Sequence, residues 1–415
     1  MTETIEPGTI EPGSIEREAP ELPLHMRRDG FDPVPAMAAM RDDEGVRRVD
    51  TAFGMPAFLV ARHADVRALL ADHTRFSNEF RRGVDVPGAP ELTEEERARM
   101  RAGNLLGVDP PEHTRLRRML TPEFTVRRMR RLEPRIVEIV DDHLDAMEKA
   151  GPPADLVADF ALPIPSLVIC ELLGVPYADR ESFQRRTGKL LDLSLPMEER
   201  LELGRESREY MAGLVAGAQA EPGEDMLGML VREHGHDLTT DELIGIAQLL
   251  LIAGHETTSN MLGLGTLALL RHPDQLALVR DEPAAVGHAV EEMLRFLGIV
   301  HSGIPRTTTE DVEVGGVVIP ADSLVVLALA TANRDPLFLT GGDRLDVTRD
   351  AGGHLAFGHG VHHCLGAPLA RMEMRIAFPA LLRRFPGLSL AVPFEEVGFR
   401  AFHFIYGLQA LPVTW

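Results

Sequence analysis

The chain has 415 residues, with 43 Lys and Arg against 64 Asp and Glu, which gives a formal net charge of −21. So acidic a chain is a poor candidate for nucleic-acid binding, because neutralising phosphate groups requires a surplus of Lys and Arg. Its two cysteines, Cys170 and Cys364, are too few for the disulfide framework of a small extracellular protein, and we expect a cytoplasmic protein.

The first 25 residues have the composition of a flexible acidic tail. The sequence Ile-Glu-Pro-Gly occurs at residues 5–8 and again at 10–13, and glutamates stand where a secretory signal would have a basic start and an apolar run. The longest apolar run, residues 243–253, is far shorter than the roughly 18 residues that cross a bilayer, so no membrane anchor is expected. Residues 26–415 contain no linker or repeat and are expected to form a single domain.

Beyond the tail, helical periodicity dominates the sequence. Strand-like runs are short and occur at residues 57–61, 312–319 and 324–329, whereas helical patterns are clear over residues 127–150, 239–270 and 284–296. Helices joined to a few short strands, with no long linker between them, predict a mainly α fold with a small β part.

The predicted helix over residues 239–270 is the longest element. Thr239 and Glu242 form a capping-box pattern at its start. Residues 243–252 are apolar nearly all round the helix, which indicates burial. At about 1.5 Å per residue, a helix of this length can cross the whole molecule.

Polar residues interrupt this buried helix at residues 253–260, which read Ala-Gly-His-Glu-Thr-Thr-Ser-Asn. One interpretation is that the helix turns a polar side to solvent. The other is a polar notch, in which Gly254 lets a flat group approach and Glu256 and Thr257 handle protons. A glycine in a helix lowers helix stability by about 1 kcal/mol relative to alanine, which indicates that Gly254 has a structural or functional role.

Residues 357–366 near the C-terminus read Phe-Gly-His-Gly-Val-His-His-Cys-Leu-Gly. The three glycines predict tight backbone turns around Cys364. Pro368 and the apolar spacing after it predict a helix that begins just after the cysteine. We therefore expect Cys364 at a helix N-terminus, where N–H groups and the positive end of the helix dipole stabilise a thiolate.

Four uses of Cys364 remain open at this point. Zinc usually takes paired cysteines, a cysteine nucleophile has no matching motif here, and an inert buried role suits Cys170 better. Thiolate ligation of haem iron is favoured, because it explains the glycines of a loop that lies flat beneath a wide macrocycle. The histidines that zinc could recruit are His354, His359, His362 and His363.

The segment 357–366 resembles the haem-ligand loop of the cytochrome P-450 family, the haem-thiolate monooxygenases. Residues 253–258 are similar to the oxygen-activation motif on the long central helix of that family. The resemblance covers about residues 30–415 and is strongest to actinobacterial enzymes of secondary metabolism. It implies the cytochrome P-450 fold, with haem held between the central helix and the C-terminal cysteine loop, and one catalytic domain.

Two further motifs support the resemblance. Glu292 and Arg295 resemble the Glu-x-x-Arg pair of the family, which Arg349 would complete as a buried ionic network. Residues 332–336, Ala-Asn-Arg-Asp-Pro, match a segment that recurs in bacterial members. Alone, a Glu and an Arg three residues apart would more often be a weak surface pair.

The resemblance implies haem b, iron protoporphyrin IX, with Cys364 as the metal ligand. Thr257 is expected to orient and protonate bound dioxygen, and Glu256 to relay protons from solvent, as the catalytic pair. The two haem propionates need cationic partners, which His113, Arg117, Arg306 and His362 would supply. The full set of cofactor-binding positions implied in this sequence is His113, Arg117, Ala253, Gly254, Arg306, Phe357, Gly358, His362, Cys364 and Gly366.

The same resemblance implies a ferredoxin with an NAD(P)H-dependent ferredoxin reductase as electron donor, since the sequence contains no flavin or iron–sulfur motif. Arginines concentrated before and after Glu123, and again after Cys364, predict a basic docking face for an acidic ferredoxin. Arg117 is the exception and is expected to point inward. These arginines are Arg115, Arg117, Arg118, Arg127, Arg128, Arg130, Arg131, Arg371 and Arg375.

The implied substrate is an apolar, medium-to-large small molecule such as a polyketide or macrolide, a terpenoid or a fatty acid, which a monomeric enzyme hydroxylates or epoxidises with O2. His301, Ser302 and His403 could hydrogen-bond a polar substituent. Two alternatives are a peroxide-driven peroxygenase and a non-catalytic haem-binding protein, neither of which explains Glu256 and Thr257. The segments expected to line the pocket are residues 81–106, 181–195, 297–304 and 401–406.

Overall fold

A computed structural model of the chain describes residues 22–79, 93–176, 179 and 186–415. Most of the expected tail therefore lies outside the described residues. Leu24 and His25, at its end, belong to the folded structure, because a short 3-10 helix spans Leu24–Met26 and His25 is buried.

The fold is mainly α with a small β part, as predicted. The α-helices are α1 Pro35–Asp43, α2 His63–Ala71, α3 Glu94–Arg101, α4 Glu112–Leu120, α5 Val126–Ala150, α6 Pro163–Leu173, α8 Met197–Ala220, α9 Met226–His234, α10 Thr240–Arg271, α11 Pro273–Asp281, α12 Val286–Leu297, α13 Leu329–Ala332 and α14 Ala367–Arg384. The strands are β1 Arg28–Asp29, β2 Asp32–Pro33, β3 Val46–Asp50, β4 Pro56–Val60, β5 Phe76–Ser77, β6 Ala154–Asp155, β7 Ile304–Thr308, β8 Val312–Val314, β9 Val317–Ile319, β10 Leu324–Leu327, β11 Ser389–Leu390 and β12 Pro412–Thr414.

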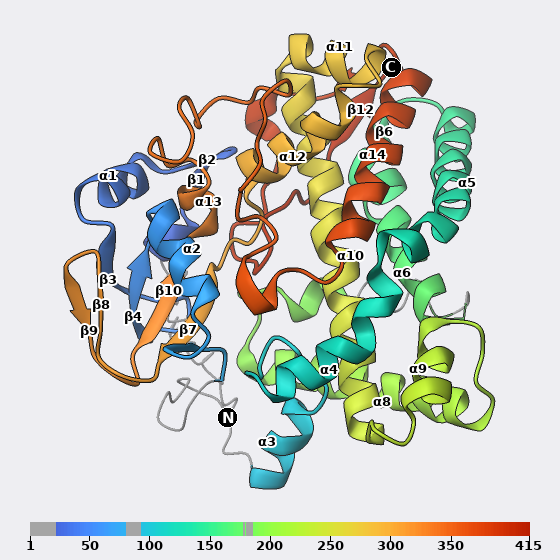
Figure 1. Cartoon of the computed structure of the whole chain (residues 1–415). Coiled ribbons are helices and arrows are strands. Elements are labelled where there is room, and N and C mark those ends of the chain that lie inside the picture. Colours follow the sequence, from blue (N-terminus) through green and yellow to red (C-terminus); the bar gives the residue numbers. More distant parts are fainter. Residues whose placement is uncertain (1–21, 80–92, 177–178, 180–185) are drawn as a thin grey trace, which may run out of the picture.

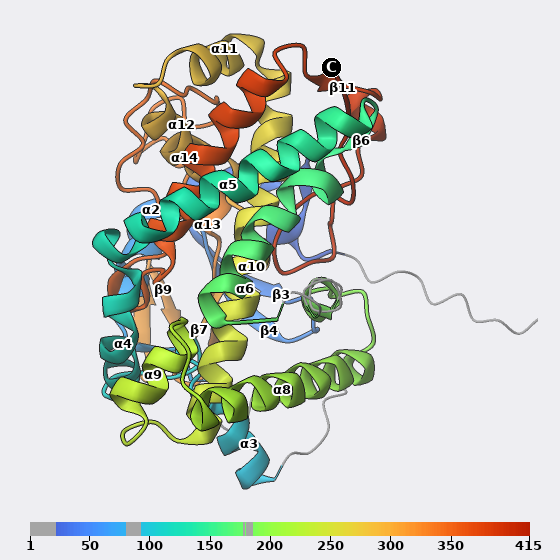
Figure 2. The ribbon, with the colours of Figure 1, turned by 90° about the vertical axis from the view of Figure 1, so that its right-hand side faces the viewer.

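Helix α10 runs through the middle of the molecule in both Figure 1 and Figure 2. The capping box is formed as predicted: the Thr239 side chain accepts from the Glu242 N–H, and the Glu242 carboxylate accepts from the Thr239 N–H. Helices α6, α8, α12 and α14 pack around α10. Because apolar side chains cover most of its circumference, the helix is buried along nearly its whole length.

The larger sheet lies on one side of the helical part, with α1 and α2 beside it (Figure 1). Its strand order is β3-β4-β10-β7-β5, and only the β4–β10 pair is parallel. Two predicted strands, 57–61 and 324–329, correspond to β4 and β10 at its centre, although the second ends early and α13 follows. The third, 312–319, is the β8–β9 hairpin.

Glu292 and Arg295 form the buried ion pair that the sequence predicts. Both side chains are 0 % exposed, and the Arg295 Nε donates to Glu292 Oε2 over 2.7 Å. Arg349 completes the network, with its Nε 3.7 Å from Glu292 Oε1. Arg295 also donates to the carbonyl groups of Asn333 and Gly342, so the pair ties α12 to the coil that leads toward the cysteine loop.

The segment 332–336 is a second connection point. Asn333 accepts from the Leu355 N–H, and Asp335 accepts from the His63 N–H at the start of α2. The Arg334 guanidinium lies over the Phe296 ring, 4.2 Å from its centroid. These contacts fix the coil before Cys364 against both the sheet side and α12.

Three basic side chains, those of His25, Arg28 and His301, meet where the N-terminal segment packs on the loop after α12. The Arg28 guanidinium donates to the carbonyl groups of Leu297 and Gly298, and its charge lowers the pKa of His301, which burial already places well below the ordinary value. Burial lowers the pKa of His25 from 6.5 to about 4, although its hydrogen bond to the Ser302 carbonyl raises it. Both histidines are therefore neutral in the folded protein near pH 7.

Acid is expected to destabilise the fold through these histidines. The pKa of His25 is about 4 in the folded state and 6.5 in the unfolded state. Its contribution to stability is therefore fully present above about pH 6.5 and is lost as the pH falls toward 4, because the unfolded chain then binds the proton more readily. His25 alone accounts for a loss of about 2 kcal/mol between about pH 7.5 and pH 5, measured by urea unfolding of the holoprotein. His25→Phe should flatten the pH dependence, whereas His236→Asn on the surface should not. An equal pH dependence in both variants would contradict this account.

Candidate active site

The loop before α14 wraps closely around Cys364. Gly360 has φ +74°, and a Cβ there would come within 2.6 Å of the Leu70 carbonyl oxygen, so only glycine fits. The Cys364 N–H donates to the Phe357 carbonyl over 2.9 Å, and α14 begins three residues after the cysteine, as predicted. The loop thereby holds Cys364 just before the helix N-terminus.

The Cys364 side chain is accessible although protein atoms surround it. These atoms lie closely enough around the sulfur for burial to raise the thiol pKa above its ordinary value of 9.0. The N–H groups of Gly366 and Ala367, and the charges of Arg117 and Arg371, lower it by less. The helix N-terminus by itself therefore does not bring the pKa of this thiol below its ordinary value.

The side chains of the polar notch on α10, residues 253–260, point to two different sides of the helix. Ala253 is exposed in the middle of an otherwise buried helix, and the Thr257 hydroxyl one turn later donates to its carbonyl over 2.8 Å. Gly254 also has a packing role that the sequence does not reveal, because a Cβ there would come within 2.9 Å of Ile169 Cδ1 in α6. The glycine lets α6 pack closely, and the exposed alanine marks the open side of the helix.

Glu256 points to the neighbouring side of α10 and is buried, with 1 % of its residue surface exposed. Its Oε2 accepts from Arg400 Nη1 over 3.1 Å and from Asn260 Nδ2 over 2.9 Å. Burial raises the pKa of this carboxyl group, but the charges of His255, Arg400 and His403 outweigh burial and leave the pKa below its ordinary value. Glu256 is therefore held as a carboxylate.

Four basic side chains gather beside the cysteine loop: His113, Arg117, Arg306 and His362. The rings of His113 and His362 lie 4.0 Å apart, and all four of their ring nitrogens are buried without a hydrogen-bond partner among the described residues. Burial, and then the charges of His113, Arg306 and Arg117, lower the pKa of His362 to about 3. Burial lowers the pKa of Arg306 to about 10.

Among the described residues, Asp109 is the acidic side chain that acts on this basic cluster. The carboxylate of Asp109 lies close enough to favour the charged forms of His113 and Arg306, but it already accepts from Ser77 and from the Asn78 N–H. Buried imidazoles without partners beside an accessible cysteine fit a ligand that carries anionic groups, as the two propionates of haem would. The residues present therefore fit the cofactor that the sequence predicts.

The remaining predicted cofactor contacts lie around Cys364. Phe357 and Gly358 begin its loop, and the Arg371 guanidinium covers the Phe357 ring at 4.5 Å. A Cβ at Gly366 would meet no atom within 4 Å, so that position is open. Among the described residues, no group of three or more His, Cys, Asp and Glu could hold a metal ion together, which gives the zinc alternative no support.

Sequence reasoning missed two residues of this region. His73, just after α2, faces the basic cluster and lowers the pKa of His113 and His362, and its own Nδ1 is buried without a partner among the described residues. Arg400 reaches Glu256 across 144 positions of sequence. No local pattern marks either residue, because both depend on how distant segments meet.

The structure does not support the expected substrate contacts of His301 and His403. Both are buried, and they hydrogen-bond backbone carbonyl groups, His301 that of Ala401 and His403 those of Ile405 and Gly188. Both ring nitrogens of His403 and the Nε2 of His301 are thus engaged with the backbone, while the His301 Nδ1 is buried without a partner among the described residues. Part of the expected pocket lining, residues 81–92 and 181–185, lies outside the described residues.

Known proteins with similar sequences and structures identify the family of this chain. Residues 218–389 match the family model described as Cytochrome P450. "Cytochrome P450 FAS1" of Rhodococcoides fascians is 52 % identical over 95 % of this chain and 99 % of its own length. "Vitamin D(3) 25-hydroxylase" of Pseudonocardia autotrophica is 44 % identical over 92 % of this chain and 93 % of its own. The solved P450 StaH from glycopeptide antibiotic A47934 biosynthesis has a TM-score of 0.84 at 45 % identity, over 95 % of this chain and all of its own.

The chain belongs to the cytochrome P450 family, of the type found in actinobacteria. It is accordingly a P450 monooxygenase that binds haem b. No helix among the described residues is long and apolar enough to span a membrane.

Proposed function

We propose that residues 26–415 act as one catalytic domain, a cytoplasmic monomer that uses O2 and electrons from a ferredoxin to hydroxylate or epoxidise an apolar, medium-to-large substrate. The observation that carries this proposal is the basic cluster beside Cys364, in which the ring nitrogens of His113 and His362 are buried without a hydrogen-bond partner among the described residues. When bound, thiolate-ligated haem supplies the activation of dioxygen for inserting one oxygen atom into a substrate.

In this proposal each group of side chains has a separate role in binding haem or in transferring protons. Cys364 ligates the iron, with the N–H groups of Gly366 and Ala367 on its sulfur. His113, Arg117, Arg306 and His362 bind the propionates, while Ala253, Gly254, Phe357 and Gly358 contact the macrocycle. Thr257 holds a hydroxyl on the open side of α10, and Glu256, one residue earlier, takes up protons.

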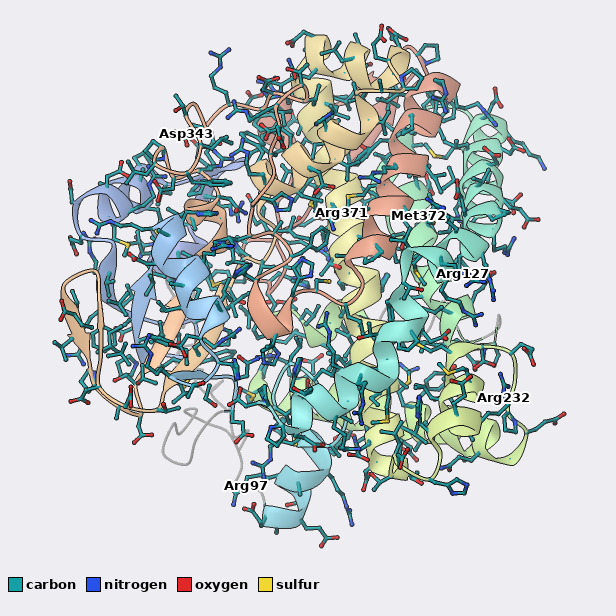
Figure 3. The ribbon with its side chains drawn as sticks, viewed as in Figure 1. Arg97, Arg127, Arg232, Asp343, Arg371 and Met372 are labelled. Atoms are coloured by element: carbon teal, nitrogen blue, oxygen red, sulfur yellow. The ribbon has the colours of Figure 1, made fainter. Side chains whose placement is uncertain are left out.

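The proposed ferredoxin site is the face formed by α4, the start of α5 and the first turns of α14, which lie together toward the viewer in Figure 1. Figure 3 labels Arg127 and Arg371 there. Several predicted docking arginines are engaged within the protein: Arg115 pairs with Glu112 and Glu242, Arg128 with Glu123, and Arg371 with Glu291. Arg375 is exposed, but its Nη2 lies 3.6 Å from Glu291 Oε1. The exposed arginines of this face that have no carboxylate partner among the described residues are Arg118, Arg127, Arg130 and Arg131.

Arg127→Glu is expected to slow reduction by ferredoxin about tenfold at low salt, because it reverses a charge at the proposed docking face. Haem content and substrate affinity should not change. Arg383→Glu, which makes the same charge change at the far end of α14, is the matched control. Stopped-flow reduction at low and high salt measures both variants. Equal rates for the two variants at low salt would reject the docking face.

The apolar substrate class rests on the family and on the backbone hydrogen bonds that engage two polar side chains near the expected pocket. His301 and His403, the polar candidates nearest the expected pocket, are bonded to the backbone. A substrate recognised mainly by burial of apolar surface is consistent with that arrangement. The P450 relative that is a vitamin D3 hydroxylase acts on a substrate of this kind, which suggests sterol-like molecules for the first panel.

One set of measurements tests the proposed function. A carbon-monoxide difference spectrum should show the red-shifted band of thiolate-ligated haem. Turnover should then require a ferredoxin, its reductase and NADPH, and a spin-state titration with sterols, fatty acids and macrolides should identify the substrate class. Normal turnover with hydrogen peroxide alone would favour a peroxygenase, and binding without turnover a haem carrier.

A further inference from the structure

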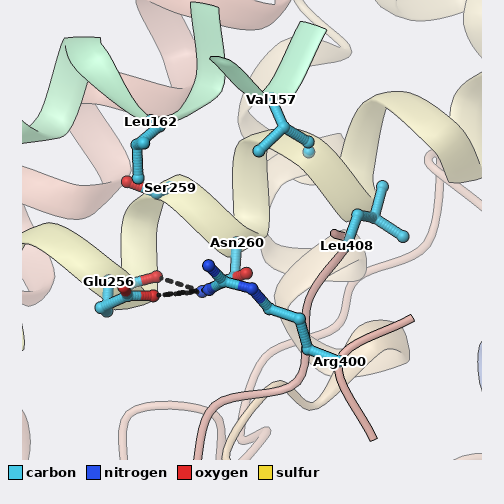
Figure 4. A pocket seen from close by; sticks show the side chains of 8 residues that line it. Val157, Leu162, Glu256, Ser259, Asn260, Arg400 and Leu408 are labelled. Carbon is cyan, nitrogen blue, oxygen red and sulfur yellow. Dashed lines mark hydrogen bonds and ion pairs between the residues drawn. The ribbon is translucent and has the colours of Figure 1, made fainter. Parts of the chain in front are cut away.

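Glu256 is locked in place by an arginine from a distant segment. The Arg400 guanidinium points at its carboxylate in Figure 4, with Asn260 beside the contact. The two side chains form an ion pair at 3.1 Å, and the Arg400 side chain is 27 % exposed while that of Glu256 is 1 % exposed. Arg400 thus links a buried carboxylate to the surface.

A small cavity adjoins this ion pair. Its volume is about 10 Å³, which is room for one water molecule. Polar and apolar groups share the lining, so that a water there has hydrogen-bond partners on one side. The lining residues are Val157, Leu162, Glu256, Ser259, Asn260, Gly263, Arg400 and Leu408.

The ion pair holds Glu256 away from the open side of α10. Successive residues in an α-helix are about 100° apart around its axis, so Glu256 and Thr257 point to neighbouring sides. Thr257 bonds Ala253 on the open side, whereas Glu256 bonds Asn260 and Arg400 on the other. Glu256 Oε1 has no hydrogen-bond partner among the described residues, so only one oxygen is tied.

We infer that Arg400 is a positioning residue for proton uptake, which holds the Glu256 carboxylate at the solvent-side cavity and releases it when Glu256 turns toward Thr257. This inference rests on the proposed role of Glu256. The step moves one proton and no electrons. The carboxylate takes the proton from a water molecule, bulk solvent neutralises the hydroxide, and delivery on the Thr257 side restores the carboxylate.

The charged and titratable groups around Glu256 determine how its pKa should respond when Arg400 is replaced. His255 precedes it on α10, and Arg400 and His403 face it from the C-terminal segment; Asn260 is neutral. Burial raises the pKa of Glu256 and the positive charge of Arg400 lowers it. Without that charge, the carboxyl group should bind a proton at higher pH. The ion pair therefore sets both the place and the charge of Glu256.

The test compares holoenzyme variants by infrared pH titration and by coupling of NADPH to product. Arg400→Gln should show a protonated carboxyl band at neutral pH that disappears when Glu256→Gln is added, and its coupled turnover should fall roughly tenfold. Arg400→Lys, which keeps the charge, should recover most of both properties and is informative even if Arg400→Gln folds poorly. Arg384→Gln is the matched control, since that ion-paired arginine is also 27 % exposed and lies elsewhere.

The outcomes separate this inference from the proposed function. If Glu256→Gln couples as well as the unaltered enzyme, the proposed role of Glu256 fails. If Glu256→Gln is impaired while Arg400→Gln behaves like Arg384→Gln in both measurements, the inference about Arg400 fails alone. A double variant much worse than Glu256→Gln would also overturn it, because Arg400 would then act independently of Glu256.

Discussion

Cys364→Ser is expected to abolish the red-shifted carbon-monoxide band and to reduce oxygenation to background. A serine hydroxyl cannot replace the thiolate as a strong donor to iron, so that even protein that retains haem should be inactive. The N–H groups of Gly366 and Ala367 remain in place in this variant, which limits the change to the ligand atom. Absorption spectra and turnover with ferredoxin measure the effect.

The second cysteine provides the control. Cys170 is fully buried in α6 and is expected to act only in packing. Cys170→Ala should keep the spectrum and turnover while lowering the unfolding free energy by about 1 kcal/mol, in the range of small core truncations. A normal carbon-monoxide band in Cys364→Ser would refute the assignment of the iron ligand.

Glu292→Gln is expected to destabilise the holoprotein by about 3–5 kcal/mol, because it leaves the Arg295 guanidinium buried without its counter-charge. Both side chains are 0 % exposed, so water cannot compensate. Arg349→Gln, which removes the more distant and partly exposed member of the network, should cost less. Urea unfolding followed by haem absorbance and circular dichroism gives the free energies.

An exposed pair of the same spacing is the matched control. Arg205 Nη2 lies 2.6 Å from Glu202 Oε2 on α8, and both side chains are largely exposed. Glu202→Gln should change the unfolding free energy by less than about 0.5 kcal/mol. Similar losses for Glu202→Gln and Glu292→Gln would mean that burial of the network contributes little.

Features encoded within a short stretch could be predicted from the sequence. The capping box at Thr239 and the start of α14 after Cys364 both depend on residues within one or two helical turns, and both are present. The strands at the sheet centre were recognisable because both faces are buried and apolar. Strand β3 was not predicted, since its Val-Arg-Arg-Val-Asp sequence is that of an edge strand and charged side chains dominate it.

Contacts between distant segments escaped prediction for a different reason. The pairing of Arg115 with Glu242 and of Arg400 with Glu256 depends on the way helices and coils are packed, which no local pattern specifies. The same holds for Gly254, whose missing side chain is explained by Ile169 of another helix. Composition marked an arginine-rich surface, but only the fold distinguishes arginines bound to carboxylates from those that remain exposed.

The basic cluster of His113, Arg117, Arg306 and His362 also bears on how the enzyme is assembled. Burying two arginines beside two histidines whose ring nitrogens have no partner among the described residues costs free energy, and an anionic cofactor that binds only the folded chain recovers it. By mass action, the amount of folded protein should therefore follow the supply of haem. In an expressing cell, adding a haem precursor should then raise the yield of folded enzyme.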